Sequence, residues 1–269
     1  MMKRIVVRSP TSSIKKIRAQ LSQKGTVVSN MTISRRLSDG FGLKSRKPAR
    51  KPMLTKIMRK KRLAFAKRHQ HWTREEWRKV LFSDESTLQQ FTVRKRNIRR
   101  PPGKRYDEKY TIATMKHPPS QMVWGAMSCN GTAGHYFLTP GTTMNGQKYV
   151  ELLKDKLEMH MEIHNCTLFM HDGAPCHRSK IVTEFLRKKK IKTLDWPGNS
   201  LDLNPIENLW HLMMDKVAEK QPTSAKGLVE AIKRVWVSEI TVEYCQNPID
   251  SMPRRLAAVI KSSGGHTKY

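Results

Sequence analysis

The sequence predicts two structural units, a small all-α region followed by an α/β domain, and three observations support this division. The 269 residues provide enough chain to bury a substantial core. Residues 1–70 hold 21 Lys or Arg and a single acid, Asp39, whereas the remainder carries 31 basic and 21 acidic residues. From about residue 77, helical periodicity gives way to short apolar runs that alternate with helical segments, as in α/β folds.

The charge indicates a polyanionic partner. Lys and Arg total 52 against 22 Asp and Glu, so the formal net charge is +30, a surplus that is hard to keep compact without neutralisation. Nucleic acid is the expected partner, and an anionic membrane surface is the second candidate. No stretch approaches the roughly 18 apolar residues of a membrane span, no apolar signal segment follows the start, and four cysteines do not make a disulfide scaffold. We therefore expect a soluble protein in a reducing compartment.

Residues 1–45 are expected to form a helix-turn-helix region. Apolar residues at helical spacing run from Ser12 to Gln23, and Gly25 follows the last turn. The second helix is capped by Ser29 and is basic and rich in hydroxyl groups, as in a helix that enters a DNA major groove. The alternative is a helical hairpin whose charges only face water. Candidate DNA contacts on the second helix are Ser29, Thr32, Ser34, Arg35 and Arg36.

Residues 46–72 are predicted to form a basic linker. The strip from Gly42 to Pro52, which runs into this linker, contains prolines that favour an extended chain with basic side chains projecting at intervals, so it can follow a phosphate backbone. Together with the run from Arg59 to Arg62, the segment also matches a two-part nuclear import signal, which predicts a nuclear location. The candidate DNA contacts here are Lys44, Arg46, Lys47, Arg50 and Lys51.

Residues 73–269 are predicted to form the α/β domain. Thr73 and Glu76 have the spacing of a capping box at its first helix. Apolar runs predict strands at 80–84, 121–127, 135–138, 167–170 and 191–194. Further helices are expected after Asn145, over 179–190, after Asn204 with Pro205, and around Leu228 to Trp236.

Three carboxylates occupy informative places in this frame. Asp84 and Asp172 are expected at the ends of two strands, and Glu207 in the first turn of a helix. Adjacent strands can bring the two aspartates together, and a helix packed on the sheet can add the glutamate. Because like charges repel, such a cluster makes sense as a site for Mg²⁺. Two ions about 3.5–4 Å apart would activate a nucleophile and stabilise the leaving oxygen of a phosphodiester.

Each acid also has a structural explanation. Glu207 can be a capping partner of Asn204, and the two aspartates can be turn-formers. Glu85 is a rival to Asp84, although strand alternation points it to the opposite face. A zinc site at His171, Cys176 and His177 is not favoured, because the paired Cys-x-x-Cys spacing is missing.

Three stretches carry a family resemblance. They are Phe82-Ser83-Asp84-Glu85-Ser86, His171-Asp172-Gly173-Ala174-Pro175-Cys176-His177 and Leu201-Asp202-Leu203-Asn204-Pro205-Ile206-Glu207-Asn208-Leu209-Trp210, with 34 residues between Asp172 and Glu207. The wording and spacing resemble the DDE transposases of the mariner superfamily, in its Tc-type branch. The likeness continues to the closing Ser251-Met252-Pro253-Arg254-Arg255.

The resemblance implies an RNase H-like (retroviral integrase-like) catalytic fold. It further implies Mg²⁺-dependent cleavage, with Mn²⁺ as substitute, at transposon ends in double-stranded DNA, and joining of the freed 3′ hydroxyl to a TA target. Asp84, Asp172 and Glu207 would be the catalytic metal ligands. The basic stretch Arg94–Arg105 falls where relatives carry a loop that clasps a partner subunit, which suggests a homodimer on DNA. No small-molecule substrate and no membrane are implied.

One departure from the family pattern is expected to matter. Relatives begin with two helix-turn-helix units, whereas Met1–Val7 looks like the tail of the second unit's first helix, so the first unit is expected to be absent. The competing hypothesis is a non-catalytic, transposon-derived DNA-binding protein. Replacing Asp172 by Asn separates the two hypotheses, because it abolishes cutting only in an enzyme.

Overall fold

The computed structural model describes residues 1–49, 51–90, 99–111, 115–116 and 118–269. It contains two compact units, Met1–Lys51 and Pro52–Tyr269. The boundary falls inside the predicted linker of residues 46–72. The strip expected to be extended ends at Pro52, and the second half of the linker forms helix α4 (Lys56–Arg68), which packs against α11 (Met252–Lys261) in the second unit.

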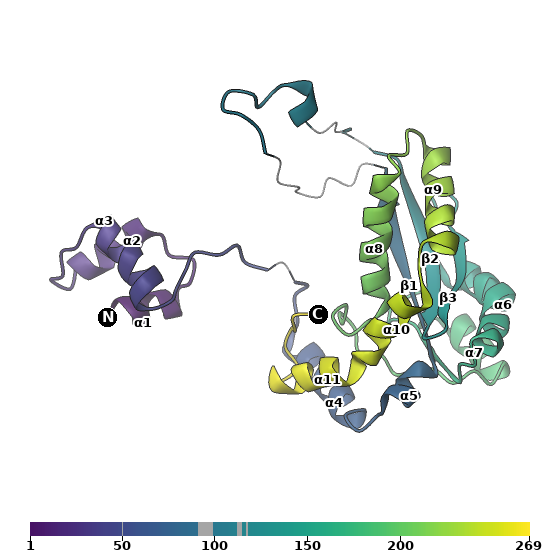
Figure 1. Cartoon of the computed structure of the whole chain (residues 1–269). Helices are drawn as coiled ribbons and strands as arrows, with labels where there is room; N and C mark the ends of the chain where they lie inside the picture. Colours follow the sequence, from purple (N-terminus) through teal and green to yellow (C-terminus); the bar gives the residue numbers. More distant parts are fainter. Residues whose placement is uncertain (50, 91–98, 112–114, 117) are drawn as a thin grey trace. The chain divides into compact units, whose positions relative to one another are not determined.

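The first unit is a three-helix unit with its own core (Figure 1). Its helices are α1 (Met2–Arg8), α2 (Ile14–Ser22) and α3 (Asn30–Arg35), and a π-helical turn, Arg36–Gly40, follows. The Ser13 and Ser29 side chains cap α2 and α3 by accepting hydrogen bonds from backbone N–H groups. Five buried apolar side chains hold the helices together: Met2, Ile17, Leu21, Ile33 and Leu37. The predicted pair of helices after residue 12 is therefore confirmed.

The second unit contains a mixed sheet of four strands in its described part. The strands are β1 (Val80–Gln89), β2 (Ser120–Ser128), β3 (Gly131–Phe137) and β4 (Leu168–Met170), in the order β3-β2-β1-β4. β1 runs antiparallel to β2 and parallel to β4. The strand expected at 191–194 is reduced to one bridge, between Thr193 and Phe169. Asp84 does not end its strand, because β1 continues to pair with β2 as far as Gln89.

Helices cover both faces of this sheet (Figure 1). One face packs on α6 (Gly146–Ile163) and α7 (Lys180–Lys188). The other packs on α4, α5 (Arg74–Arg78), α8 (Ile206–Glu219), α9 (Ala225–Ser238), α10 (Val242–Asp250) and α11. Strand alternation assigns the side chains, since Val80 and Phe82 enter the second core and Leu81 the first. The predicted α/β class is confirmed.

Two local features shape this unit. The capping box predicted at α5 is present, with Thr73 N donating to Glu76 Oε2 at 2.7 Å and Glu76 N donating to Thr73 Oγ1 at 3.3 Å. In the middle of β2, a Cβ on Gly125 would lie 2.8 Å from the Trp210 ring of α8 and closer still to Trp236. The absence of a side chain at this position lets α8 lie close to the sheet. None of the helices in the described ranges is long and apolar enough to cross a membrane.

Candidate active site

Asp84 and Asp172 follow the paired part of two neighbouring strands. β1 and β4 are parallel, with Val80 opposite Leu168 and Phe82 opposite Met170. Asp84 lies two residues after Phe82, and Asp172 lies two residues after Met170, where β4 ends. Both side chains line one pocket. The expectation that strand pairing brings these aspartates together agrees with this geometry.

Glu207 acts on Asp84 from the adjoining helix. It lies in the first turn of α8, which packs on β1. Burial raises the pKa of Asp84 to about 8, and the negative charges of Glu207, Glu85 and Asp172 contribute to this rise. Burial also raises the pKa of Glu207. Three acids distant in sequence therefore share one electrostatic environment, in which added positive charge would be strongly stabilised.

His177 holds Asp172 and Glu85. Its ring is buried, and it contacts Asp172 Oδ1 through Nδ1 at 2.7 Å and Glu85 Oε1 through Nε2 at 3.2 Å. Burial opposes protonation of the ring, but the hydrogen bonds to the two carboxylates raise the pKa of His177 to about 10, so it is an imidazolium that donates to both. Burial likewise opposes ionisation of Asp172, yet its bonds from His177 and from Ala174 N–H lower its pKa.

Glu85 lies on the sheet face opposite to Asp84, as alternation predicted. It reaches His177 on the side where α6 packs, whereas Asp84 shares the face of α8. On that same side the Tyr149 hydroxyl lies 3.2 Å from His171 Nδ1. Burial lowers the pKa of His171 to about 4, so its neutral ring can accept a hydrogen bond from the Tyr149 hydroxyl. The His171 ring also stacks on the ring of His177, which is hydrogen-bonded to Asp172.

Asn204 has a different position from the one expected of a helix cap. Pro205 is the N-cap of α8, and no side chain caps that helix. Asn204 is 3% exposed, and its Oδ1 accepts no hydrogen bond from the described residues. The residue lines the pocket that holds Asp84 and Asp172. A buried polar atom without a partner is costly, so this amide oxygen has a reason to meet a ligand.

The donor set of this site suits a hard divalent cation. Carboxylate and amide oxygens are the ligands that Mg²⁺ and Mn²⁺ prefer, and the pocket volume of about 110 Å³ has room for several waters at roughly 30 Å³ each. Within the described ranges, no three His, Cys, Asp or Glu side chains converge tightly enough to hold an ion as they stand. His177 is hydrogen-bonded to Oδ1 of Asp172, so Asp172 would bind a metal ion through Oδ2 or after a small rotation of its side chain.

The predicted DNA contacts of the first unit lie mostly on its surface. Ser34, Arg35 and Arg36 are exposed at the end of α3, and Lys44, Arg46, Lys47 and Lys51 are exposed in the segment that follows. Ser29 and Thr32 serve the helix itself, since Ser29 Oγ accepts from Thr32 N at 3.1 Å and lies 2.9 Å from Thr32 Oγ1. Arg50 and residues 94–98 of the expected dimer loop are outside the described residues.

Sequence reasoning missed the functions of three residues near the pocket. The sequence pattern suggested only a disfavoured zinc site for His177, a rival to Asp84 for Glu85 and a helix cap for Asn204. His177 follows Asp172 by five residues in a turn, a distance that allows a side chain to fold back. No sequence signal marks Asn204 as a pocket residue, because its exposure to the pocket depends on how the loop before α8 folds.

Comparisons with known proteins cover most of the chain. A family described as "DDE superfamily endonuclease" matches residues 79–228, and a helix-turn-helix family described as "Transposase" matches residues 1–71. The Tcb2 transposase of Caenorhabditis briggsae is 37% identical over 242 residues, covering 88% of this chain and 87% of the relative. The Tc1 transposase of Caenorhabditis elegans is 34% identical over 258 residues, covering 90% and 89%.

Solved structures show the same fold. The mariner Mos1 paired-end complex with Mg matches with a TM-score of 0.82 at 18% identity, over 99% of this chain and 79% of that chain. The Mos1 strand transfer complex matches with a TM-score of 0.80 at 19% identity, over 99% and 78%. The expected helix-turn-helix region and RNase H-like domain are therefore confirmed as a fold. The expected absence of a first helix-turn-helix unit stays a prediction.

Proposed function

The chain belongs to the Tc1/mariner family of DDE transposases, and on that premise we propose that Asp84, Asp172 and Glu207 hold divalent metal ions for DNA cleavage and strand transfer. The activity is cut-and-paste DNA transposition by a DDE endonuclease. The observation that carries the site assignment is the convergence of Asp84 and Asp172 in one pocket, with the charge of Glu207 acting on Asp84. Mg²⁺ is the proposed ion and Mn²⁺ its substitute, consistent with the Mos1 paired-end complexes solved with Mg and with Mn.

The residues of this site have different proposed roles. Divalent ions held by the three acids would activate a nucleophile and stabilise the leaving oxygen of a phosphodiester. Asp84 supplies a half-buried carboxylate on β1, which lies between β2 and β4. His177 fixes the orientation of the Asp172 carboxylate by donating a hydrogen bond to it. Asn204 presents its amide oxygen to the same pocket.

The first unit supplies the DNA contacts in this proposal. Arg35 at the end of α3 and Arg36, which begins the π-helical turn, would reach base edges and phosphates, and Lys44, Arg46 and Lys47 would follow the DNA backbone. Binding to transposon-end DNA is supported by the Mos1 complexes, which contain transposon ends. A homodimer on DNA, insertion at TA and a nuclear location complete the proposal. Family membership supports insertion at TA, and the basic segments support the homodimer and the nuclear location.

The test compares cutting with binding. A plasmid that carries the parent element's inverted repeats is incubated with the full chain and Mg²⁺ or Mn²⁺, and nicking and strand transfer are followed on gels. Wild type should cut, and Asp172→Asn, Asp84→Asn and Glu207→Gln should each abolish cutting while DNA affinity is retained. DNA affinity should fall steeply with salt in all of them. Cutting by the Asp172→Asn protein would contradict the site assignment.

The non-catalytic alternative has one structural observation in its favour. The acids of the described chain do not form a ready three-ligand group, and a protein that only binds DNA needs none. It predicts salt-dependent DNA binding, no metal-dependent nicking by wild type, and no increase in thermal stability on adding Mn²⁺. The same plasmid assay therefore separates the two functions.

A further inference from the structure

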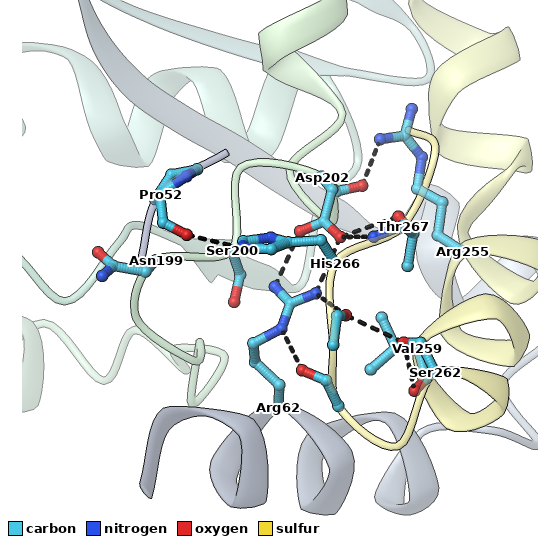
Figure 2. Close-up of polar contacts among 12 residues, drawn as sticks. Pro52, Arg62, Asn199, Ser200, Asp202, Arg255, Val259, Ser262, His266 and Thr267 are labelled. Carbon is cyan, nitrogen blue, oxygen red and sulfur yellow. Dashed lines mark hydrogen bonds and ion pairs between the residues drawn. The ribbon is translucent and has the colours of Figure 1, made fainter. Parts of the chain in front are cut away.

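The segment that carries Glu207 is held by groups from both ends of the second unit. The loop before α8 is contacted by α4 near the start of this unit and by α11 and the C-terminal residues at its end (Figure 2). Loops are usually less ordered than the elements they connect. A catalytic acid at the end of a loop therefore needs such support if its position is to be reproducible.

Arg255 spans this segment on both sides of Glu207. The guanidinium belongs to α11 and is 2% exposed. Its Nη1 donates to the backbone oxygen of Asp202 at 2.9 Å, and its Nη2 donates to Asn208 Oδ1 at 2.6 Å. Nε donates to Ser251 Oγ at 2.8 Å, which fixes the fork on α11. One planar group thus ties the residue five before Glu207 to the residue directly after it.

The carboxylate of Asp202 anchors the other side of the same loop. Arg62 of α4 donates to both of its oxygens at 2.8 Å, and Thr267 donates to Oδ2 from its backbone N at 3.0 Å and from Oγ1 at 2.8 Å. Arg62 also donates to the backbone oxygens of Gly264 and Gly265. Asp202 and Glu207 both belong to the family motif Leu201–Trp210, but the Asp202 carboxylate is bound by Arg62 and Thr267 and so has a structural role.

We propose that Arg255 is a positioning residue for Glu207, and that it acts by bridging Asp202 and Asn208 across the turn that begins α8. This inference rests on the proposed function, because it matters only if Glu207 is a ligand. The guanidinium is suited to the task, since a planar fork can hold two acceptors in fixed directions and a lysine ammonium cannot. Groups that orient metal ligands from outside typically change metal affinity by about 10–100-fold when removed.

The experiment measures Mn²⁺ binding to the full chain by electron paramagnetic resonance and calorimetry, with thermal unfolding recorded in parallel. Arg255→Lys removes the bridge from the arginine side. Asn208→Ala removes one acceptor from an exposed side chain, so it tests the same bridge even if Arg255→Lys fails to fold. Arg78→Lys is the matched control, because Arg78 also makes a two-pronged contact, with Asp250 at 2.9 and 2.7 Å, between α5 and α10.

The proposal predicts that Arg255→Lys and Asn208→Ala weaken Mn²⁺ binding about tenfold or more. Arg78→Lys should lower the unfolding temperature but leave Mn²⁺ affinity unchanged. Wild-type Mn²⁺ affinity in a folded Asn208→Ala protein would overturn the inference, as would an equal loss in Arg78→Lys. Glu207→Gln distinguishes failure of the proposed metal site from failure of the positioning role of Arg255. If wild type binds Mn²⁺ no better than Glu207→Gln, the assignment of Glu207 as a ligand fails, and the inference about Arg255 fails with it.

Discussion

Removal of the Asp202 carboxylate should strongly destabilise the second unit. The side chains of Arg62 and Asp202 are 0% and 3% exposed, so Asp202→Ala leaves a buried guanidinium without its counter-charge. Breaking a buried pair by deleting one partner costs about 3–5 kcal/mol. Arg62 retains the carbonyl oxygens of Gly264 and Gly265 as acceptors, which favours the lower end. Thr267 loses its acceptor as well, so we expect a loss of about 3 kcal/mol or slightly more.

Urea unfolding followed by tryptophan fluorescence measures this loss. All six tryptophans lie between Trp72 and Trp236, within the second unit, so the signal is not affected by unfolding of the first. Asp195→Ala is the control, because its pair with Arg68 has side chains that are 85% and 60% exposed and such pairs contribute about 0–1 kcal/mol. If Asp202→Ala lowers the unfolding free energy no more than Asp195→Ala does, the assignment of Asp202 as a structural anchor is refuted.

Three further predictions follow from the same region. Burial opposes ionisation of Asp202, but its hydrogen bonds from Arg62 and Thr267 lower its pKa below the ordinary 3.8, so its contribution to stability is present above that pH and is lost below it. In urea titrations, the difference in unfolding free energy between wild type and Asp202→Asn should therefore shrink as the pH falls below about 3.8. A difference that stays constant with pH would contradict this prediction. Gly264 has φ +79°, and a Cβ there would collide with the Arg59 carbonyl oxygen, whereas Gly141 has φ +76° and open space around it. Gly141→Ala should lower the unfolding free energy by about 1–2 kcal/mol through backbone strain, and Gly264→Ala should lower it clearly more. Equal losses of unfolding free energy would argue against the collision. Asn204→Ala removes an oxygen without a partner among the described residues, so stability should hardly change while plasmid nicking falls at least about tenfold, and unchanged nicking would show that this amide does not meet a ligand.

The sequence predicted local structure well because helix caps and strand alternation depend on residues only a few positions apart. Ser29, Thr73 and Asn145 cap their helices as hydrogen-bonding rules predict. Alternation correctly separated Asp84 from Glu85, since successive strand residues must face opposite ways. The strand at 191–194 was predicted from an apolar run alone, and that run pairs at a single bridge because most of it serves as a connection. The length of β1 beyond Asp84 was missed because its polar half is stabilised by pairing with β2, not by apolar residues.

The sequence by itself determined the charge division, the order of the helices and strands, and the three acids in their family context. These depend on residue identity and on neighbours a few positions away. Only the tertiary structure decided how the acids are supported, that His177 holds Asp172, and that Asp202 is bound by scaffold residues while the charge of Glu207 acts on Asp84. Such roles follow from contacts such as Arg62 with Asp202, whose partners are 140 residues apart. The spacing of residues in the sequence does not show which distant segment packs against a given side chain, because such contacts form only when the chain folds.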